Sequence, residues 1–285
     1  MGMSSYEELC DISIDLLKEG RWDEAYDELI RREANGDKDA VAVLAQFYLY
    51  GVGITKDVET AIELLNKAVA MGSADAAWKL GLIYYNNDHG VPVNKHKAVE
   101  FFEKGAQGGN VDCCGVLADC YMRGDGVLED PAKAFHYAMI AAKAGNSTGM
   151  ISAAICYDDG IGTGPDPLAA CHWYKEYLNY EPEDDFVMLR IALCLADPYE
   201  RYGVNATDEM LNEAFYYTSK AVEKGNVEAH LIIGWFYERG KVVQQDFDLA
   251  HRYVQIAADN GHKFAKEHLQ AFRKNIYGNY YIPGF

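Results

Sequence analysis

The sequence of 285 residues has little proline, no paired-cysteine motif and no long apolar run. With seven prolines and 49% hydrophobic residues, the composition excludes disordered and collagen-like chains. The seven cysteines form no CxxC pair and no regular framework, which predicts a reducing compartment. No window of about 18 apolar residues exists, and Glu7, Glu8, Asp11 and Asp15 interrupt the stretch where a signal peptide would need apolar residues. The sequence therefore predicts a cytoplasmic protein.

Basic residues are also scarce. The 26 Lys and Arg stand against 44 Asp and Glu, for a formal net charge of −18. This sign repels nucleic-acid phosphates and anionic lipid headgroups, because like charges lie on both sides of the contact. We therefore expect neither nucleic acid nor membrane as a partner, and we expect any charged protein partner to be basic.

Motifs of catalysis and metal binding are missing too. There is no G-x-S-x-G, no S-x-x-K, no G-x-G-x-x-G after a strand and no Walker loop. The eight histidines never take the spacing of a helical zinc site. Cys113 and Cys120 could share a helix face, but such thiols are more often small buried hydrophobic groups. The sequence predicts no enzyme, no cofactor and no metal.

What the chain does have is a period of about 36 residues. Glycines in similar contexts follow each other at intervals of 36, 37, 36, 80 and 36 residues: Gly36, Gly72, Gly109, Gly145, Gly225 and Gly261. The interval of 80 corresponds to two periods with about eight inserted residues, which fall around 180–185 and 202–207. A fixed period of this length is typical of a repeat array.

Each period carries two apolar stripes at helical spacing. The first places an apolar and a small residue ahead of a tyrosine, as in Leu44-Ala45 with Tyr48. A glycine-rich turn follows, and a side chain able to cap a helix then precedes an alanine that opens the second stripe. The predicted caps are Asp57, Asn94, Asp130, Asp166 and Asp246. The sequence predicts an all-α fold made of repeated helix pairs.

This pattern, best seen in residues 39–73 and 111–146, resembles the Sel1-like repeat family, a relative of the tetratricopeptide repeat. The resemblance covers roughly residues 37–272 and implies a right-handed α/α solenoid. The fifth copy, about 182–226, departs most, since Pro198 falls in its first helix and Tyr202 takes the place of a loop glycine.

The expected organisation has three parts. Residues 3–36 form a tetratricopeptide-like capping pair, with Leu9, Ile12, Leu16 and Leu17 on its first stripe. Residues 37–262 hold six repeats, and residues 263–285 supply a closing helix with Phe264, Leu269 and Phe272 inward, followed by an aromatic tail. The tail either folds over the last repeat as a plug or docks elsewhere, for example on a second copy.

Function in such families resides on the concave surface lined by the first helices. By analogy with tetratricopeptide repeats, its exposed positions lie two and five residues on either side of the apolar residue before the small one. These positions include Ala42, Leu49, Leu82, Thr148, Ile151 and Leu231. The residues expected to bind a partner are Gln46, Asp75, Trp78, Tyr85, Asp112, Asp119, Met122, Asp158, Glu228, Trp235 and Glu238.

Carboxylates beside tryptophan, tyrosine and methionine suit a basic or aromatic-rich protein segment, through ion pairs and cation–π contacts. An alternative is that Asp39, Asp75, Asp112 and Glu228 only favour the first turn of each helix through its dipole. The contacts of these carboxylates in the folded protein distinguish partner binding from a purely structural role.

We therefore expect a non-catalytic interaction scaffold or adaptor. An alternative is a neutralising protein for a basic partner such as a toxin, since opposite charge speeds association. A remote alternative is a hydrolase, because some relatives have been associated with penicillin-type antibiotics. Those relatives carry a disulfide in each repeat, and this chain has Val69 and Ala77 at the corresponding places.

Overall fold

The computed structural model describes residues 6, 9–10, 15, 18–196 and 206–284. Pro198 and Tyr202, together with Ile12, Leu16 and Leu17, lie outside the described residues. The chain divides into two compact units, Met1–Ser152 and Ala153–Phe285, and each is described by itself.

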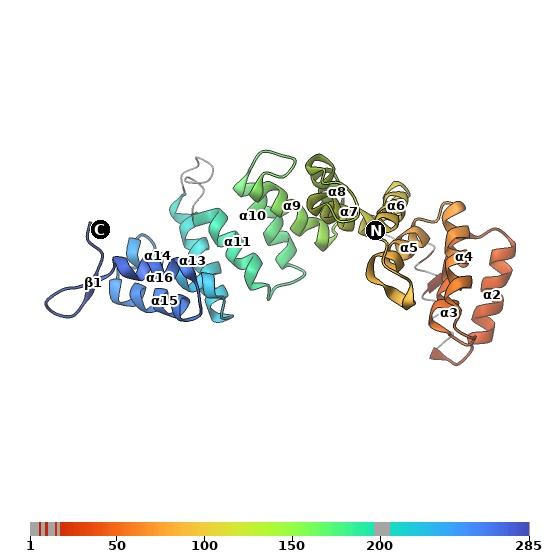
Figure 1. Cartoon of the computed structure of the whole chain (residues 1–285), viewed down its shortest axis with the longest axis horizontal. Helices are drawn as coiled ribbons and strands as arrows, with labels where there is room; N and C mark the ends of the chain where they lie inside the picture. Colours follow the sequence, from red (N-terminus) through yellow and green to blue (C-terminus); the bar gives the residue numbers. More distant parts are fainter. Residues whose placement is uncertain (1–5, 7–8, 11–14, 16–17, 197–205, 285) are drawn as a thin grey trace. The chain divides into compact units, whose positions relative to one another are not determined.

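In the first unit the described residues form helices joined by turns (Figure 1). They are α2 (Trp22–Ala34), α3 (Lys38–Tyr50), α4 (Val58–Ala70), α5 (Ala74–Asn86), the short 3-10 helix η1 (Asp88–Gly90), α6 (Lys95–Gln107), α7 (Val111–Arg123) and α8 (Pro131–Lys143). Helix α9 (Ser147–Asp159) contains the boundary between the units.

The second unit continues the same helix pairs and ends in a small hairpin (Figure 1). Its elements are α10 (Pro167–Leu178), α11 (Asp185–Ala196), α13 (Asp208–Glu223), α14 (Val227–Arg239), α15 (Phe247–Asp259), α16 (Lys263–His268), η2 (Leu269–Ala271), β1 (Arg273–Lys274) and β2 (Tyr280–Tyr281). The described residues confirm the predicted all-α class of repeated helix pairs.

The turn inside each repeat has a repeated design. The first helix ends on a left-handed residue, Gly51 (φ 69°) in one repeat and Asn87 (φ 59°) in another, a conformation that glycine and asparagine adopt at low cost. The chain then returns so that the backbone N–H of Asp57 donates to the carbonyl of Tyr48 at 2.9 Å. The Asp57 side chain in turn accepts from Thr60 N–H and caps α4. All five predicted caps bind first-turn amides in this way.

Large and small residues alternate where the two helices of a repeat meet. Gly81 of α5 faces Phe102 of α6, and a Cβ at Gly81 would lie 2.2 Å from the ring. The absence of that Cβ lets Phe102 become fully buried. On another side of the pair, Tyr84 stacks on Phe101 with ring centroids 5.9 Å apart, and Lys97 lies 4.0 Å from the centre of the Tyr84 ring.

The C-terminal end differs in part from expectation. The closing helix α16 ends at His268, and Phe264 is 50% exposed, so the inward position predicted for Phe264 is wrong. Phe272 is buried as expected. Of the two alternatives for the tail, packing on the last repeat is seen for its later residues: the rings of Tyr280 and His251 stack with centroids 3.7 Å apart, and Ile282 packs against the last apolar cluster. The N–H of Tyr280 also donates to Asp248 at 2.8 Å.

Candidate partner-binding face

We call the first-helix positions named in the sequence analysis the inner face. Its residues differ widely in exposure. Asp112 and Glu228 are exposed, and Asp158 and Glu238 are buried, each with 3% of its surface exposed. The other residues expected to bind a partner are partly exposed: Gln46, Asp75, Trp78, Tyr85, Asp119, Met122 and Trp235.

The expectation that Asp158 is exposed is wrong. Its carboxylate forms an ion pair with the guanidinium of Arg190 from α11 and accepts a hydrogen bond from the hydroxyl of Tyr174 at 3.3 Å. Asp159 also contacts Arg190, at 3.1 Å. A buried carboxylate is tolerated only when its charge is paired, so this group ties α9 to α11.

Glu238 is also buried, and its expected exposure is likewise wrong. Its Oε1 lies 2.8 Å from Nε2 of His268 in α16. Asp158 and Glu238 each stand twelve residues after the Asn that caps their helix, at positions 146 and 226. Their partners, Arg190 and His268, each stand six residues after the cap of the following first helix, at positions 184 and 262. Contacts at equivalent positions therefore join α9 to α11 and α14 to α16, each pair being two successive first helices.

The acids at the starts of the first helices have a similar structural role. Asp75 accepts from the side-chain amide of Asn110 at 2.9 Å, and Asp112 accepts from that of Asn146 at 2.8 Å. The side-chain oxygen of each Asn caps its own helix: Asn110 accepts the N–H of Cys113, and Asn146 accepts the N–H of Gly149. These acids therefore hold the cap of the next repeat, in addition to any interaction with the helix dipole.

Within the first unit, Trp78 and Tyr85 rest on a common support. Their rings lie 5.4 Å and 6.0 Å from the ring of Phe102, which packs against Gly81 between them. Trp78 is thus partly exposed on a buried aromatic base, so binding through it costs little side-chain entropy.

The hydroxyl of Tyr85 is already engaged. It donates to Asp125 in the next repeat at 2.7 Å, and the ammonium of Lys95 binds the same carboxylate oxygen at 2.7 Å. Lys95 and then Tyr85 hold the pKa of Asp125 below its usual value. Only the ring of Tyr85 is therefore left to take part in partner contact.

The first-repeat inner face is covered by the chain itself. Ala42 and Leu49, expected to be exposed, are 0% and 2% exposed, so this expectation is wrong. Gln46 donates from its side-chain amide to the hydroxyl of Tyr6. The sequence analysis placed Tyr6 in the capping pair of residues 3–36 and assigned it no contact, because its partner Gln46 stands 40 residues later in the chain.

The remaining inner-face residues lie in both units. In the first, Asp119 pairs with Arg123 at 2.6 Å, one turn along α7, near the partly exposed Met122 in sequence. In the second, Trp235 meets Phe264 edge to face, with centroids 6.2 Å apart. Each unit therefore offers a partly exposed tryptophan.

Groups that could support chemistry are few among the described residues. No group of three or more His, Cys, Asp or Glu able to hold a metal ion is found there. All seven cysteines lie in the described part, and none of them forms a disulfide. Burial raises the pKa of Cys120 and of Cys156 to about 12, which disfavours the reactive thiolate.

The tandem helix pairs and their repeated caps define an α-helical repeat protein of the solenoid class. The Sel1 repeat family model matches residues 38–73, 74–110, 112–146, 147–176, 203–226 and 227–262. The chain belongs to the Sel1 repeat family. Among the described residues, no helix is long and apolar enough to cross a bilayer.

Two curated fungal proteins are similar in sequence. Chitin synthase regulator SKT5 of Saccharomyces cerevisiae is 27% identical over 242 residues, or 81% of this chain and 29% of that protein. Chitin synthase regulatory factor 1 of Schizosaccharomyces pombe is 24% identical over 147 residues, or 50% of this chain and 32% of that protein. The chain thus spans about three tenths of the length of these relatives.

Solved structures share the fold. The antigen c5321 of uropathogenic Escherichia coli, described as having an SLR fold, matches with a TM-score of 0.71 and 21% identity over 93% of this chain and 56% of that one. A Sel1 repeat protein of Oxalobacter formigenes matches with a TM-score of 0.59 and 22% identity over 87% of this chain and 96% of that one. At these identities the likeness concerns the fold alone.

Proposed function

We propose that this protein is a non-catalytic adaptor that binds a segment of a partner protein on the inner face of its first helices. The observation that carries the proposal is Trp78, which is partly exposed and supported from beneath by the buried ring of Phe102. Rigid aromatic side chains of this kind dominate the energetics of many protein interfaces. Trp235, partly exposed and in edge contact with the half-exposed Phe264, supplies a second aromatic group in the second unit.

The family relationship supports a role exerted through other proteins. Both curated relatives are named as regulators of an enzyme, chitin synthase. We propose that this chain likewise acts on a partner protein, in a reducing cytoplasmic compartment that suits seven cysteines joined by no disulfide.

The contacts of the acidic side chains refine the expected partner. Asp75, Asp112, Asp158 and Glu238 already bind side chains of the neighbouring repeat. We therefore propose that aromatic and apolar contacts supply most of the affinity. The net charge of −18 instead attracts basic flanks of the partner at long range and raises the association rate.

The same charge favours a second candidate role, the neutralisation of a basic protein. The two roles differ in salt dependence, because electrostatic steering is screened when ionic strength rises. A steep fall of both the association rate and the affinity with salt supports neutralisation, whereas a fall of the rate with an affinity that salt changes little supports the adaptor.

The test is affinity capture from extract of the source cells with the full chain as bait, at low and high ionic strength. We compare wild type with Trp78→Ala, Trp235→Ala and the double variant. The control is Leu128→Ala, which removes a loop side chain that is 88% exposed in the first unit. Circular dichroism verifies that each bait is folded.

The proposal predicts a partner that wild type and Leu128→Ala retain and that at least one tryptophan variant loses. Equal recovery of every captured protein by folded wild type and by the folded double variant would refute it.

A further inference from the structure

The hairpin of the second unit carries two large apolar side chains at its tip. The loop between β1 and β2 projects away from the helices (Figure 1), and Ile276 and Tyr277 in it are 90% and 82% exposed. Among the described residues, only Leu128 exposes a comparable fraction of a large apolar side chain. Adjacent exposed apolar side chains indicate an interaction site more often than single scattered ones do.

The turn itself does not require these two side chains. Gly278 has the left-handed φ of 87°, and its N–H donates to the carbonyl of Asn275 at 3.0 Å. The side-chain oxygen of Asn275 accepts the N–H groups of Tyr277 and Asn279 at 2.9 and 3.0 Å. Asparagine and glycine therefore supply the turn chemistry. The apolar character of Ile276 and Tyr277 requires another explanation.

The base of the hairpin is fixed on the last repeat. Tyr280 stacks on His251, and its N–H donates to Asp248. The ammonium of Lys274 lies 4.8 Å from the centre of the Tyr280 ring. The tip is therefore a preorganised projection, and docking it costs little conformational entropy.

The hairpin also lies in a basic stretch of an acidic chain. Residues 260–285 contain four Lys and Arg, among them Arg273 and Lys274 of β1, against one acid, Glu267. Residues 1–152, the first unit, contain 14 Lys and Arg against 24 Asp and Glu. The hairpin is therefore complementary in charge to the first unit of another copy. At physiological ionic strength the Debye length is about 8 Å, so charges at the contact count for more than the net charge of each copy.

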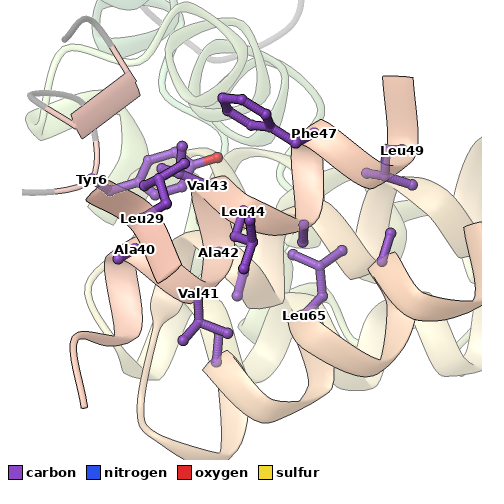
Figure 2. Close-up of a cluster of buried hydrophobic side chains, with 14 of the residues drawn as sticks. Tyr6, Leu29, Ala40, Val41, Ala42, Val43, Leu44, Phe47, Leu49 and Leu65 are labelled. Carbon is purple, nitrogen blue, oxygen red and sulfur yellow. The ribbon is translucent and has the colours of Figure 1, made fainter. Parts of the chain in front are cut away.

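Within the first unit, the inner face of α3 is closed to such a partner. Figure 2 shows Tyr6 of the capping pair beside Leu29 and Val43, with which it belongs to one buried cluster. The partly exposed aromatic side chains of this unit's inner face lie on α5, at Trp78 and Tyr85.

Carboxylates accompany the rings of α5. Asp75 stands one turn before Trp78, and Asp112 takes the equivalent position on α7. Each accepts a hydrogen bond from a neutral side-chain amide, of Asn110 and Asn146 respectively, and such a bond positions a carboxylate without neutralising it. This surface matches an exposed tyrosine that has two basic residues nearby.

Trp235 of the second unit suits the hairpin less. It contacts Phe264 of α16, a helix that also carries Lys263 and Lys266. Their charges have the same sign as those of the hairpin, so like charges would meet there.

We infer that the hairpin tip of one copy docks on the α5 surface of a second copy. Ile276 and Tyr277 contact Trp78 there, and the basic side chains of β1 face Asp75 and Asp112. The contact is heterologous, because each copy contributes a different surface, so it continues from copy to copy. The inference rests on the proposed function, because it uses the same anchor and makes a second copy a competitor for the partner.

The test measures the mean mass of the full chain by sedimentation equilibrium at about 0.15 M salt. The mass of wild type is expected to rise with concentration. Ile276→Ser with Tyr277→Ser, the tip variant, and Trp78→Ala are each expected to weaken self-association at least about tenfold. Leu128→Ser is the control, since it removes a similarly exposed apolar side chain, and it is expected to associate as wild type does. A wild type that stays monomeric up to about 1 mM overturns the inference.

Mixing the two defective variants is the decisive experiment. The tip variant keeps its α5 surface and Trp78→Ala keeps its hairpin, so the mixture is expected to form a complex of one copy of each. This complex does not grow further, because each copy lacks one half of the contact. A self-complementary interface gives no such rescue. Failure of the mixture to associate, with both variants folded by circular dichroism, overturns the inference.

Charge variants test the placement even if Trp78→Ala does not fold. Arg273→Gln with Lys274→Gln removes two exposed charges of the hairpin, and Asp112→Asn removes one from the inner face while keeping an oxygen for Asn146. Both are expected to weaken self-association by about two- to fivefold. Unchanged self-association in both variants overturns the placement on α5.

The result is separable from the proposed function. The tip variant lacks only the hairpin contact, so it is expected to capture a partner from extract at least as well as wild type. Absent self-association with intact Trp78-dependent capture counts against this inference alone. Rescue in the mixture without any captured partner counts against the adaptor proposal alone.

Discussion

Asn110→Asp tests the connection between two successive repeats. In the wild type, Oδ1 of Asn110 accepts the N–H of Cys113 at 3.0 Å, and Nδ2 donates to Asp75 at 2.9 Å. Aspartate keeps the cap, because Asp and Asn are about equally good at this position. It removes the bond to Asp75 and sets two carboxylates face to face. A hydrogen bond to a charged group contributes about 1.5–3 kcal/mol. Because both side chains are partly exposed, we expect the free energy of unfolding to fall by about 2 kcal/mol.

The exchange of both residues is the decisive comparison. Asp75→Asn with Asn110→Asp restores one amide and one carboxylate with the roles reversed, and we expect it to recover about half of the loss or more. Asn94→Asp is the matched control, because Asn94 caps α6 by accepting the N–H of Lys97 at 3.0 Å, and a change within about 0.5 kcal/mol is expected. The measurement is urea unfolding followed by circular dichroism. If Asn110→Asp is as stable as Asn94→Asp, the reasoning about this connection fails.

The other predictions concern burial and protonation. Arg190→Ala leaves Asp158 buried without its cation, and we expect the free energy of unfolding, measured by thermal unfolding, to fall by about 3–5 kcal/mol. A fall of less than about 1 kcal/mol contradicts a structural ion pair. Gly81→Ala puts a Cβ 2.2 Å from Phe102, and we expect a cost of about 1–3 kcal/mol by urea unfolding, which an unchanged midpoint would exclude. Burial, and then Lys274, lower the pKa of His251, so its contribution is present above the unfolded pKa of about 6.5 and is lost as pH falls through the lower folded value. We therefore expect the protection of the amides of residues 279–284 against hydrogen exchange, taken relative to their intrinsic rates, to fall at acid pH, an effect that His251→Phe should remove.

Much of the local structure could be predicted because short-range physics decides it. The period of glycines, the capping side chains such as Asp57 and the helical stripes all act within one helix pair. The plug formed by the tail was one of two alternatives, and the stacking of Tyr280 on His251 distinguished them.

The inner-face residues were harder to predict. Sequence position marked Asp158 and Glu238 as inner-face carboxylates, but their partners Arg190 and His268 come from the next first helix. The equal spacings of twelve and six residues from the caps were present in the sequence as a signal for both pairs. Reading that signal required knowing which turns of successive helices face each other.

The sequence by itself determined the class, the repeat length and the places where helices begin, because these depend on contacts within about one turn of the chain. The tertiary structure decided which carboxylates bind a side chain of the neighbouring repeat, as Asp75 does, and which aromatic side chains remain partly exposed, as Trp78 does. It alone placed Tyr6 on Gln46. These contacts join side chains 24 to 40 residues apart in the chain, and the packing of successive helices brings them together.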